Sequence, residues 1–192
     1  MERKYALIID QERCIGCEAC TVACRIEHNG VQGHIRVSTQ DSLCKDTPAG
    51  VFPNLRMAFL PALCNHCELP PCLEACPLEA ISKKENGIVF LDKEICDGCR
   101  TCLEACPYGA IIFNHEKDKA EKCNLCAHRI EQGQEPFCVI CCEGQAIYFG
   151  DLNDPASSVS KLLSSGKTFC LQPEFGTKPR VHYCPPKEPQ GL

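Results

Sequence analysis

The apolar residues of this chain come in short runs, separated by polar stretches and by many cysteines. Cysteines aside, the longest runs hold about four residues and occupy positions 6–9, 88–91 and 110–113. Runs of this length predict short strands, and Glu85-Asn86-Gly87 predicts a turn that joins two of them. Residues 73–76 and 103–106 predict short helices that end at the proline following each.

The C-terminal part of the chain has a different pattern. Asp154-Pro155 predicts the start of a helix that ends at Gly166 and whose apolar positions are Val159, Leu162 and Leu163. Prolines then become frequent, at Pro173, Pro179, Pro185, Pro186 and Pro189. They predict an extended strap rather than a folded unit.

No run approaches the roughly 20 apolar residues that span a bilayer. The N-terminal segment lacks the apolar region of a signal peptide and a twin-arginine pair. The net charge is −5, which disfavours a nucleic-acid partner. We therefore expect no membrane span, and contact with a membrane only through another subunit.

Cysteine carries the candidate chemistry. The chain has 20 cysteines, and 16 of them fall into four groups of four, here called quartets one to four. These are Cys14, Cys17, Cys20, Cys24; Cys64, Cys67, Cys72, Cys76; Cys96, Cys99, Cys102, Cys106; and Cys123, Cys126, Cys138, Cys142. Quartets one and three both read C-x2-C-x2-C-x3-C, the spacing with which bacterial ferredoxins bind iron–sulfur clusters. Sixteen thiolates suffice for four [4Fe–4S] clusters.

Two other uses of so many cysteines are a disulfide scaffold and a zinc-stapled interaction module. Disulfide scaffolds are typical of shorter, exported domains. Zinc sites usually present two separated cysteine pairs, whereas quartets one to three each place four thiols within about a dozen residues. We therefore favour clusters. Without its cysteines the chain is only roughly a third apolar and has no Trp, so cluster binding should contribute to folding and the apo-protein should be loose.

The quartets are repeats of one another. Quartets two, three and four each end in a similar sequence that closes with Ala-Ile, at residues 76–81, 106–111 and 142–147. Two ferredoxin-like units, each built from two quartets, explain this repeat. In two-cluster ferredoxins the fourth cysteine of one quartet binds the cluster of the other. A predicted hairpin of 19 residues separates quartets two and three, so we pair two with three and one with four.

This pairing predicts an α+β fold of two ferredoxin-like units, with short strands, short helices and long cluster-wrapping loops. The first unit comprises residues 1–27 and 115–152, the second residues 61–114; residues 28–60 are an insertion, and residues 153–192 are the helix and tail. The expected ligands are set A, Cys14, Cys17, Cys20 and Cys142; set B, Cys123, Cys126, Cys138 and Cys24; set C, Cys64, Cys67, Cys72 and Cys106; and set D, Cys96, Cys99, Cys102 and Cys76.

Four cysteines lie outside the quartets: Cys44, Cys141, Cys170 and Cys184. Cys142 is preferred to Cys141 as a ligand because Cys138-x3-Cys142 repeats the x3 spacing; the other three are expected to be buried, inert thiols. His66 is a candidate to tune a cluster by hydrogen bonding, although a packing role is favoured. The insertion at 28–60 is either a docking surface or a packed cover over the clusters.

Several motifs together resemble a known family. They are the order of the quartets, Cys67-Glu-Leu-Pro-Pro-Cys72, Cys126-x2-Arg129 with 11 residues before Cys138, Phe149-Gly150-Asp151 and Gly176-Thr177-Lys178-Pro179. In these the chain resembles the four-cluster iron–sulfur subunit of molybdopterin oxidoreductases, such as dimethyl sulfoxide reductase, polysulfide reductase and formate dehydrogenase complexes. Glu143 stands where that family usually has proline, and Cys141 where it has a small residue.

The resemblance implies a non-catalytic subunit that relays single electrons. Its partners would be a catalytic subunit that holds a molybdenum or tungsten pterin, and a membrane quinone subunit or soluble carrier. It also implies the same pairing of quartets. Such subunits can be exported with a partner, so either the cytoplasm or the outer side of the cytoplasmic membrane agrees with a chain that has no signal of its own. The alternatives are a relay for a hydrogenase or carbon monoxide dehydrogenase, and the zinc-stapled module.

Overall fold

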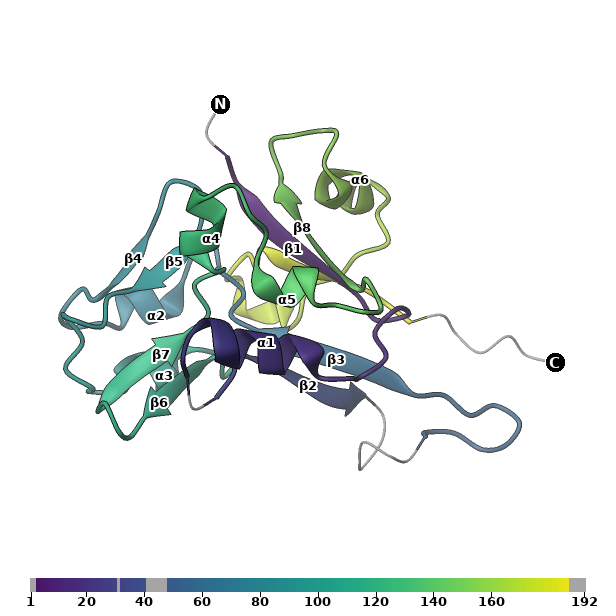
Figure 1. Ribbon diagram of the computed structural model, residues 1–192, viewed down its shortest axis with the longest axis horizontal. Coiled ribbons are helices and arrows are strands. Elements are labelled where there is room, and N and C mark those ends of the chain that lie inside the picture. Colours follow the sequence, from purple (N-terminus) through teal and green to yellow (C-terminus); the bar gives the residue numbers. More distant parts are fainter. Residues whose placement is uncertain (1–2, 31, 41–47, 187–192) are drawn as a thin grey trace.

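The computed structural model describes residues 3–30, 32–40 and 48–186 (Figure 1). The strands are β1 Tyr5–Asp10, β2 Ile35–Gln40, β3 Ala58–Leu63, β4 Ile81–Lys83, β5 Val89–Leu91, β6 Ile111–Asn114, β7 Lys119–Lys122, β8 Ile147–Asp151 and β9 Val181–Cys184. The helices are α1 Ala19–Glu27, α2 Pro71–Glu74, α3 Thr101–Ala105, α4 Ala127–Glu131, α5 Phe137–Ile140, α6 Ser158–Ser164 and a 3-10 turn at Pro173–Phe175. The predicted α+β fold with short elements is confirmed.

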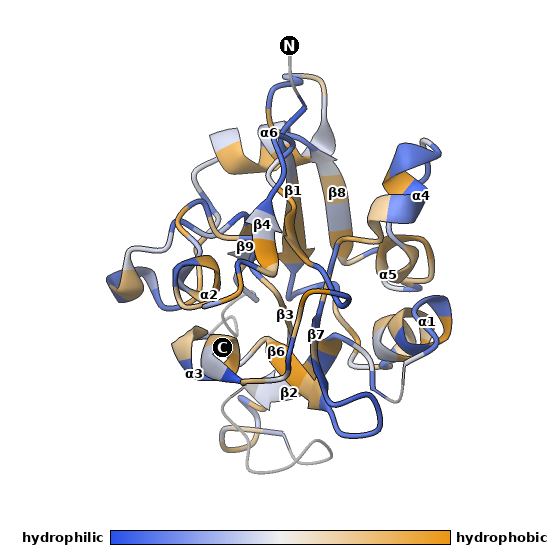
Figure 2. Ribbon diagram, turned by 90° about the vertical axis from the view of Figure 1, so that its left-hand side faces the viewer, coloured by the Kyte–Doolittle hydropathy of each residue, from blue (hydrophilic) through white to orange (hydrophobic). Residues whose placement is uncertain are grey.

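A three-stranded sheet forms the centre of the fold. Its order is β8-β1-β9, with β1 antiparallel to β8 and parallel to β9. The middle strand β1 is buried along its length, and Figure 2 colours it mostly as hydrophobic. Ala6 and Ile8 pack against the fully buried Val159 of α6, whereas Leu7 and Ile9 belong to the core that contains many of the cysteines. The sheet therefore separates the C-terminal helix from the cysteine-rich core.

Three two-stranded hairpins complete the sheet structure: β2–β3, β4–β5 and β6–β7. The predicted strands are confirmed in β1, β5 and β6, and the turn at 85–87 joins β4 to β5. In Figure 1 these last two hairpins gather with α2 and α3 at one end of the molecule. The insertion contributes β2, which pairs with β3, so a part of it is ordered sheet.

The predicted helices differ from the observed ones at their ends. Helices α2 and α3 each begin two residues earlier than predicted, and they end at Glu74 and Ala105, before the cysteine that closes each quartet. Helix α6 begins after Ser157 rather than at Asp154-Pro155, because the Ser157 hydroxyl accepts the N–H of Ser160 at 3.1 Å. The Asp154 carboxylate instead accepts the N–H of Ala156 at 2.8 Å, within a turn.

The tail is extended, and part of it is a strand of the central sheet. β9 lies parallel to β1, and Tyr183 within it is fully buried. The Tyr183 hydroxyl donates to the carbonyl of Pro61 in β3 at 3.0 Å. This strand therefore ties the sheet to the β2–β3 hairpin. In the described ranges, no helix has the length and hydropathy needed to cross a bilayer.

Candidate metal centres

The structure brings thiols from different quartets together in four places. In set A, burial raises the pKa of the Cys14 thiol, and nearby Cys142 and Cys17 add to the rise. Burial also raises the pKa of Cys20 to about 12, and its neighbours are Cys141, Cys14 and Cys142. One thiol raises the pKa of another only when the two are close together. The end of quartet four therefore lies beside quartet one.

Set B is the most deeply buried of the four. Burial raises the pKa of the Cys138 thiol well above its ordinary value, and the neighbours that add to this rise are Cys123, Cys126, Cys24 and Cys20. Cys24 closes quartet one, whereas Cys138 and the first two of these neighbours belong to quartet four. Quartets one and four therefore exchange their last cysteines in space.

Sets C and D show the same exchange between quartets two and three. Burial raises the pKa of the Cys72 thiol to about 12, and its thiol neighbours are Cys64, Cys106 and Cys67. Burial raises the pKa of Cys102 to about 11, and its neighbours are Cys96, Cys76 and Cys99. Cys106 thus lies near thiols of quartet two, and Cys76 near thiols of quartet three.

The local backbone explains how a short segment presents several thiols inward. Gly16 and Gly98 lie between the first two cysteines of quartets one and three, at φ of +69° and +81°. A Cβ on Gly98 would lie 2.4 Å from the carbonyl oxygen of Asp118. Left-handed residues follow the second cysteine as well, at Glu18 before α1 and Arg100 before α3. Quartets one and three therefore each curl into a tight loop before the helix begins.

Backbone N–H groups are directed at several of the sulfurs. Sulfur acceptors and their donors are Cys24 with His34 at 3.3 Å, Cys76 with Ala80 at 3.3 Å, Cys123 with Leu125 at 3.4 Å, and Cys142 with Ala146 at 3.2 Å. Such donors stabilise a thiolate more than a thiol. They therefore oppose the effect of burial and suit sulfurs that bind metal.

Cys141 and Cys142 have different surroundings. The Cys142 sulfur accepts the Ala146 N–H, in the same way that Cys76 accepts from Ala80 at the end of quartet two. The Cys141 thiol instead donates to the carbonyl of Cys138 at 3.7 Å. Cys141 still lies close to set A. It adds to the raised pKa of the Cys20 thiol, and Cys142 and Cys17 add to the raised pKa of Cys141 itself. It is a fifth thiol beside that set.

The residues present fit [4Fe–4S] clusters. Each set offers four thiols, and every cysteine that the structure describes is free rather than disulfide-bonded. A buried hydrogen-bond donor without a partner also lies next to set C. His66 is 1% exposed, and its Nδ1 accepts the N–H of Val89 at 3.0 Å, so the proton is on Nε2, which is buried without a partner. A cluster in set C would supply sulfur acceptors for such a donor.

A site for a single metal ion requires several ligands around one centre. Within residues 3–30, 32–40 and 48–186, no group of three or more His, Cys, Asp or Glu side chains is arranged to hold one ion. Tetrahedral zinc draws its sulfurs to about 2.3 Å from one centre. A cubane cluster would instead be held by one thiolate at each of its four irons, which the four thiols of each set would supply.

Two residues near the sulfurs were not predicted from the sequence. His28 Nε2 lies 3.4 Å from the Cys126 sulfur, although 98 positions separate the two residues. Lys122 is buried immediately before Cys123, and its only sequence signal is a charged residue next to a predicted ligand. Of the cysteines outside the quartets, Cys170 and Cys184 are half-buried, so the prediction of buried thiols is wrong for these two. Cys170 contacts His182 Nδ1 at 3.3 Å, and Cys184 lies in β9. Cys44 lies outside the described residues.

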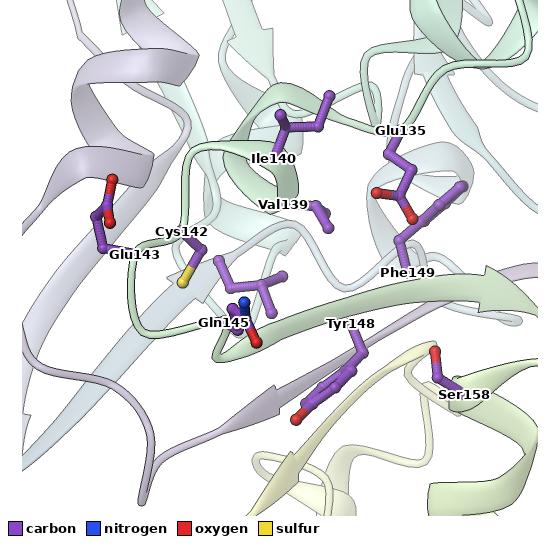
Figure 3. A pocket seen from close by; sticks show the side chains of 10 residues that line it. Glu135, Val139, Ile140, Cys142, Glu143, Gln145, Tyr148, Phe149 and Ser158 are labelled. Carbon is purple, nitrogen blue, oxygen red and sulfur yellow. The ribbon is translucent and has the colours of Figure 1, made fainter.

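A surface pocket of about 560 Å³ opens beside set A. Figure 3 shows Cys142 at its edge, with Val139 and Ile140 from α5 and Tyr148 and Phe149 from β8 around it. Ile140 is 53% exposed. Of the described set members, Cys17 in set A and Cys99 in set D are the exposed thiols. Sets A and D therefore reach the surface, whereas the thiols of set B are buried.

Comparison with known proteins agrees with this geometry. The 4Fe-4S dicluster domain family matches residues 55–152, and the 4Fe-4S binding domain family matches residues 5–25. The chain is 42% identical over 182 residues to a subunit of the tetrathionate reductase of Salmonella typhimurium, covering 94% of this chain and 72% of that protein. It is 37% identical over 188 residues to one of the polysulfide reductase chains of Wolinella succinogenes, covering 97% of each of the two proteins. It is 31% identical over 231 residues to the arsenate respiratory reductase iron-sulfur subunit of a Shewanella species, covering 94% and 95%.

Proposed function

Because the chain belongs to the family of iron–sulfur subunits of molybdopterin oxidoreductases, we propose that it relays single electrons through four [4Fe–4S] clusters. Its partners would be a catalytic subunit with a molybdenum or tungsten pterin, and a membrane quinone subunit or soluble carrier. The observation that supports the proposal is the proximity of the last cysteine of each quartet to thiols of another quartet: Cys142 to quartet one, Cys24 to quartet four, Cys106 to quartet two and Cys76 to quartet three.

The proposed ligands are the members of sets A to D, with Cys142 rather than Cys141 in set A. When bound, each cluster would take up and release one electron at a time. The chain itself would hold the clusters, exclude water and set their potentials through N–H groups and nearby charges. The burial of set B and the N–H donors to Cys24, Cys76, Cys123 and Cys142 support this role.

The contacts between sets support a linear arrangement. Sets A and B are neighbours, because Cys20 adds to the raised pKa of the Cys138 thiol. Sets B and C are neighbours, because Cys64 adds to the raised pKa of the Cys123 thiol. Sets C and D share one packed cluster that contains Cys72 and Cys96. Electrons would therefore pass along the order A, B, C, D in one direction or the other, and would enter and leave at the ends where Cys17 and Cys99 are exposed.

The same contacts support two ferredoxin-like units. The first would combine residues 1–27 and 115–152, and the pairing of β1 with β8 joins its two segments. The second would span residues 61–114, in which the β4–β5 hairpin lies between its two quartets. Residues 28–60 would be an insertion. Residues 153–192 would be a helix and tail that fasten the units together through β9.

Purification of the native complex tests the proposal. The expected result is a large pterin-containing partner, with iron and sulfide each near sixteen atoms per copy of this chain, as four cubanes require (roughly sixteen follows from four irons and four sulfides in each). Redox titration followed by electron paramagnetic resonance should resolve four midpoint potentials. Isolation of the chain only as a free monomer would contradict the proposed partnership. Nickel in the complex, without molybdenum or tungsten, would favour a relay for a hydrogenase or carbon monoxide dehydrogenase instead.

A further inference from the structure

Lys122 is a buried lysine at the end of the β6–β7 hairpin. It is 6% exposed. Its Nζ donates to the carbonyl oxygen of Cys123 at 2.8 Å and to that of Val89. Among the described residues, no Asp or Glu forms an ion pair with it. The two carbonyls satisfy hydrogen bonds of the ammonium, but they do not neutralise its charge.

The nearest carboxylate in the sequence is engaged elsewhere. Successive residues of a strand point to opposite faces, and Glu121 therefore points away from Lys122. Its carboxylate binds Lys93 Nζ at 2.7 Å and lies 3.8 Å from Lys117 Nζ. A buried ammonium without a counter-charge is strongly destabilised. Clusters bound on the inner side of β7 would supply such a counter-charge.

Thiols of two different sets lie on that inner side. Burial raises the pKa of the Cys72 thiol of set C and of the Cys123 thiol of set B, and the charge of Lys122 lowers both. Cys123 and Cys64 are themselves neighbours across the boundary between these sets. Val89 links Lys122 to quartet two. Its carbonyl accepts a hydrogen bond from Lys122, and its N–H donates to His66, which lies between Cys64 and Cys67. The ammonium thus lies where the two proposed units meet.

Thiolate-bound clusters carry negative charge, which increases on reduction. A fixed positive charge nearby stabilises the reduced form more than the oxidised form, and this effect is larger in a buried setting than in water. We propose that the buried ammonium of Lys122 raises the reduction potentials of the two clusters held by sets B and C. Because both potentials would rise together, the charge would favour the arrival of an electron on this pair of clusters from set A or set D, and would leave the driving force between the two clusters unchanged. The inference rests on the ligand sets proposed above.

The test compares four variants in the intact complex by redox titration monitored with electron paramagnetic resonance. Lys122→Met removes the charge, Lys122→Gln removes it but keeps a hydrogen-bond donor, and Lys122→Arg keeps it. Lys93→Met is the matched control, because it removes one charge from an ammonium that is 46% exposed and bound to Glu121. We expect two of the four midpoint potentials to fall in the Met and Gln variants, and none to shift appreciably in the Arg and control variants.

Several results would overturn the inference while leaving the proposed function intact. These are four clusters with unchanged potentials in both neutral variants, an equal shift in Lys93→Met, or an equal shift of all four potentials. If the neutral variants lose iron, Lys122→Arg decides: retained iron supports a requirement for the charge, and lost iron contradicts it. Failure of the wild-type complex to show four midpoints would instead contradict the proposed cluster count.

Discussion

Replacing Cys142 by alanine should remove one cluster, whereas replacing Cys141 should remove none. The two residues are adjacent, and both lie beside set A. Only the Cys142 sulfur has the position of Cys76, with an N–H donor from the alanine four residues later, at 3.2 Å against 3.3 Å. The Cys141 sulfur instead faces the carbonyl oxygen of Cys138 at 3.7 Å, and a carbonyl oxygen does not stabilise a thiolate as an N–H group does.

The size of the preference follows from this hydrogen bond. A hydrogen bond to a charged group contributes about 1.5–3 kcal/mol, which corresponds to roughly a 10- to 150-fold preference for Cys142. Loss of one cubane lowers the iron content from about sixteen to about twelve atoms per chain. Cys142→Ala should therefore lose about a quarter of its iron and one midpoint potential, and Cys141→Ala should keep all four.

Iron analysis and electron paramagnetic resonance of the purified complex measure both quantities. Cys76→Ala is the matched control, because it removes the corresponding cysteine of set D and should also cause the loss of one cluster. Loss of a cluster in Cys141→Ala, with none lost in Cys142→Ala, would refute the reasoning. Retention of four clusters in both single variants would show that either thiol suffices, and that the Ala146 hydrogen bond does not select the ligand.

Three further predictions concern the surroundings of the clusters. His28→Phe removes the imidazole that lies 3.4 Å from the Cys126 sulfur. It should lower one midpoint potential, because hydrogen bonds to ligand sulfur favour the reduced cluster. His128→Phe is the control, and an equal shift there would contradict the role of His28. Tyr183→Phe should destabilise the loaded protein by about 1–3 kcal/mol, because the buried Pro61 carbonyl loses its donor; an unchanged urea midpoint would contradict this. Removal of iron by a chelator should abolish most tertiary structure, seen as a loss of near-ultraviolet circular dichroism, because few large apolar side chains remain to hold the core.

Much of the local structure could be predicted because it depends on neighbours in the sequence. The strands at β1, β5 and β6 and the turn at 85–87 follow from short apolar runs and turn residues. The helix ends were less predictable. Ser157 rather than Asp154 caps α6, because the choice between two nearby capping residues depends on which one the packing of Val159 against β1 brings into position.

No pattern in the sequence indicates the contacts that are proposed to tune the clusters. His28 reaches Cys126 across 98 positions. The role proposed for Lys122 depends on β7, which turns its side chain away from Glu121 and toward Cys72 and Cys123. The strand order β8-β1-β9, with β9 parallel to β1, also has no local signal. Such contacts depend on how the whole chain returns on itself.

By itself, the sequence determined the number of thiols, their spacing within each quartet and hence the kind of cofactor, because a tight loop with cysteines two or three residues apart is a local geometry. The tertiary structure decided which thiols from different quartets become neighbours, which sulfurs receive backbone N–H groups, and where the buried ammonium lies. The physical reason is range. Backbone turns act over a few residues, whereas electrostatics and packing around a buried cluster combine groups that folding brings together from distant parts of the chain.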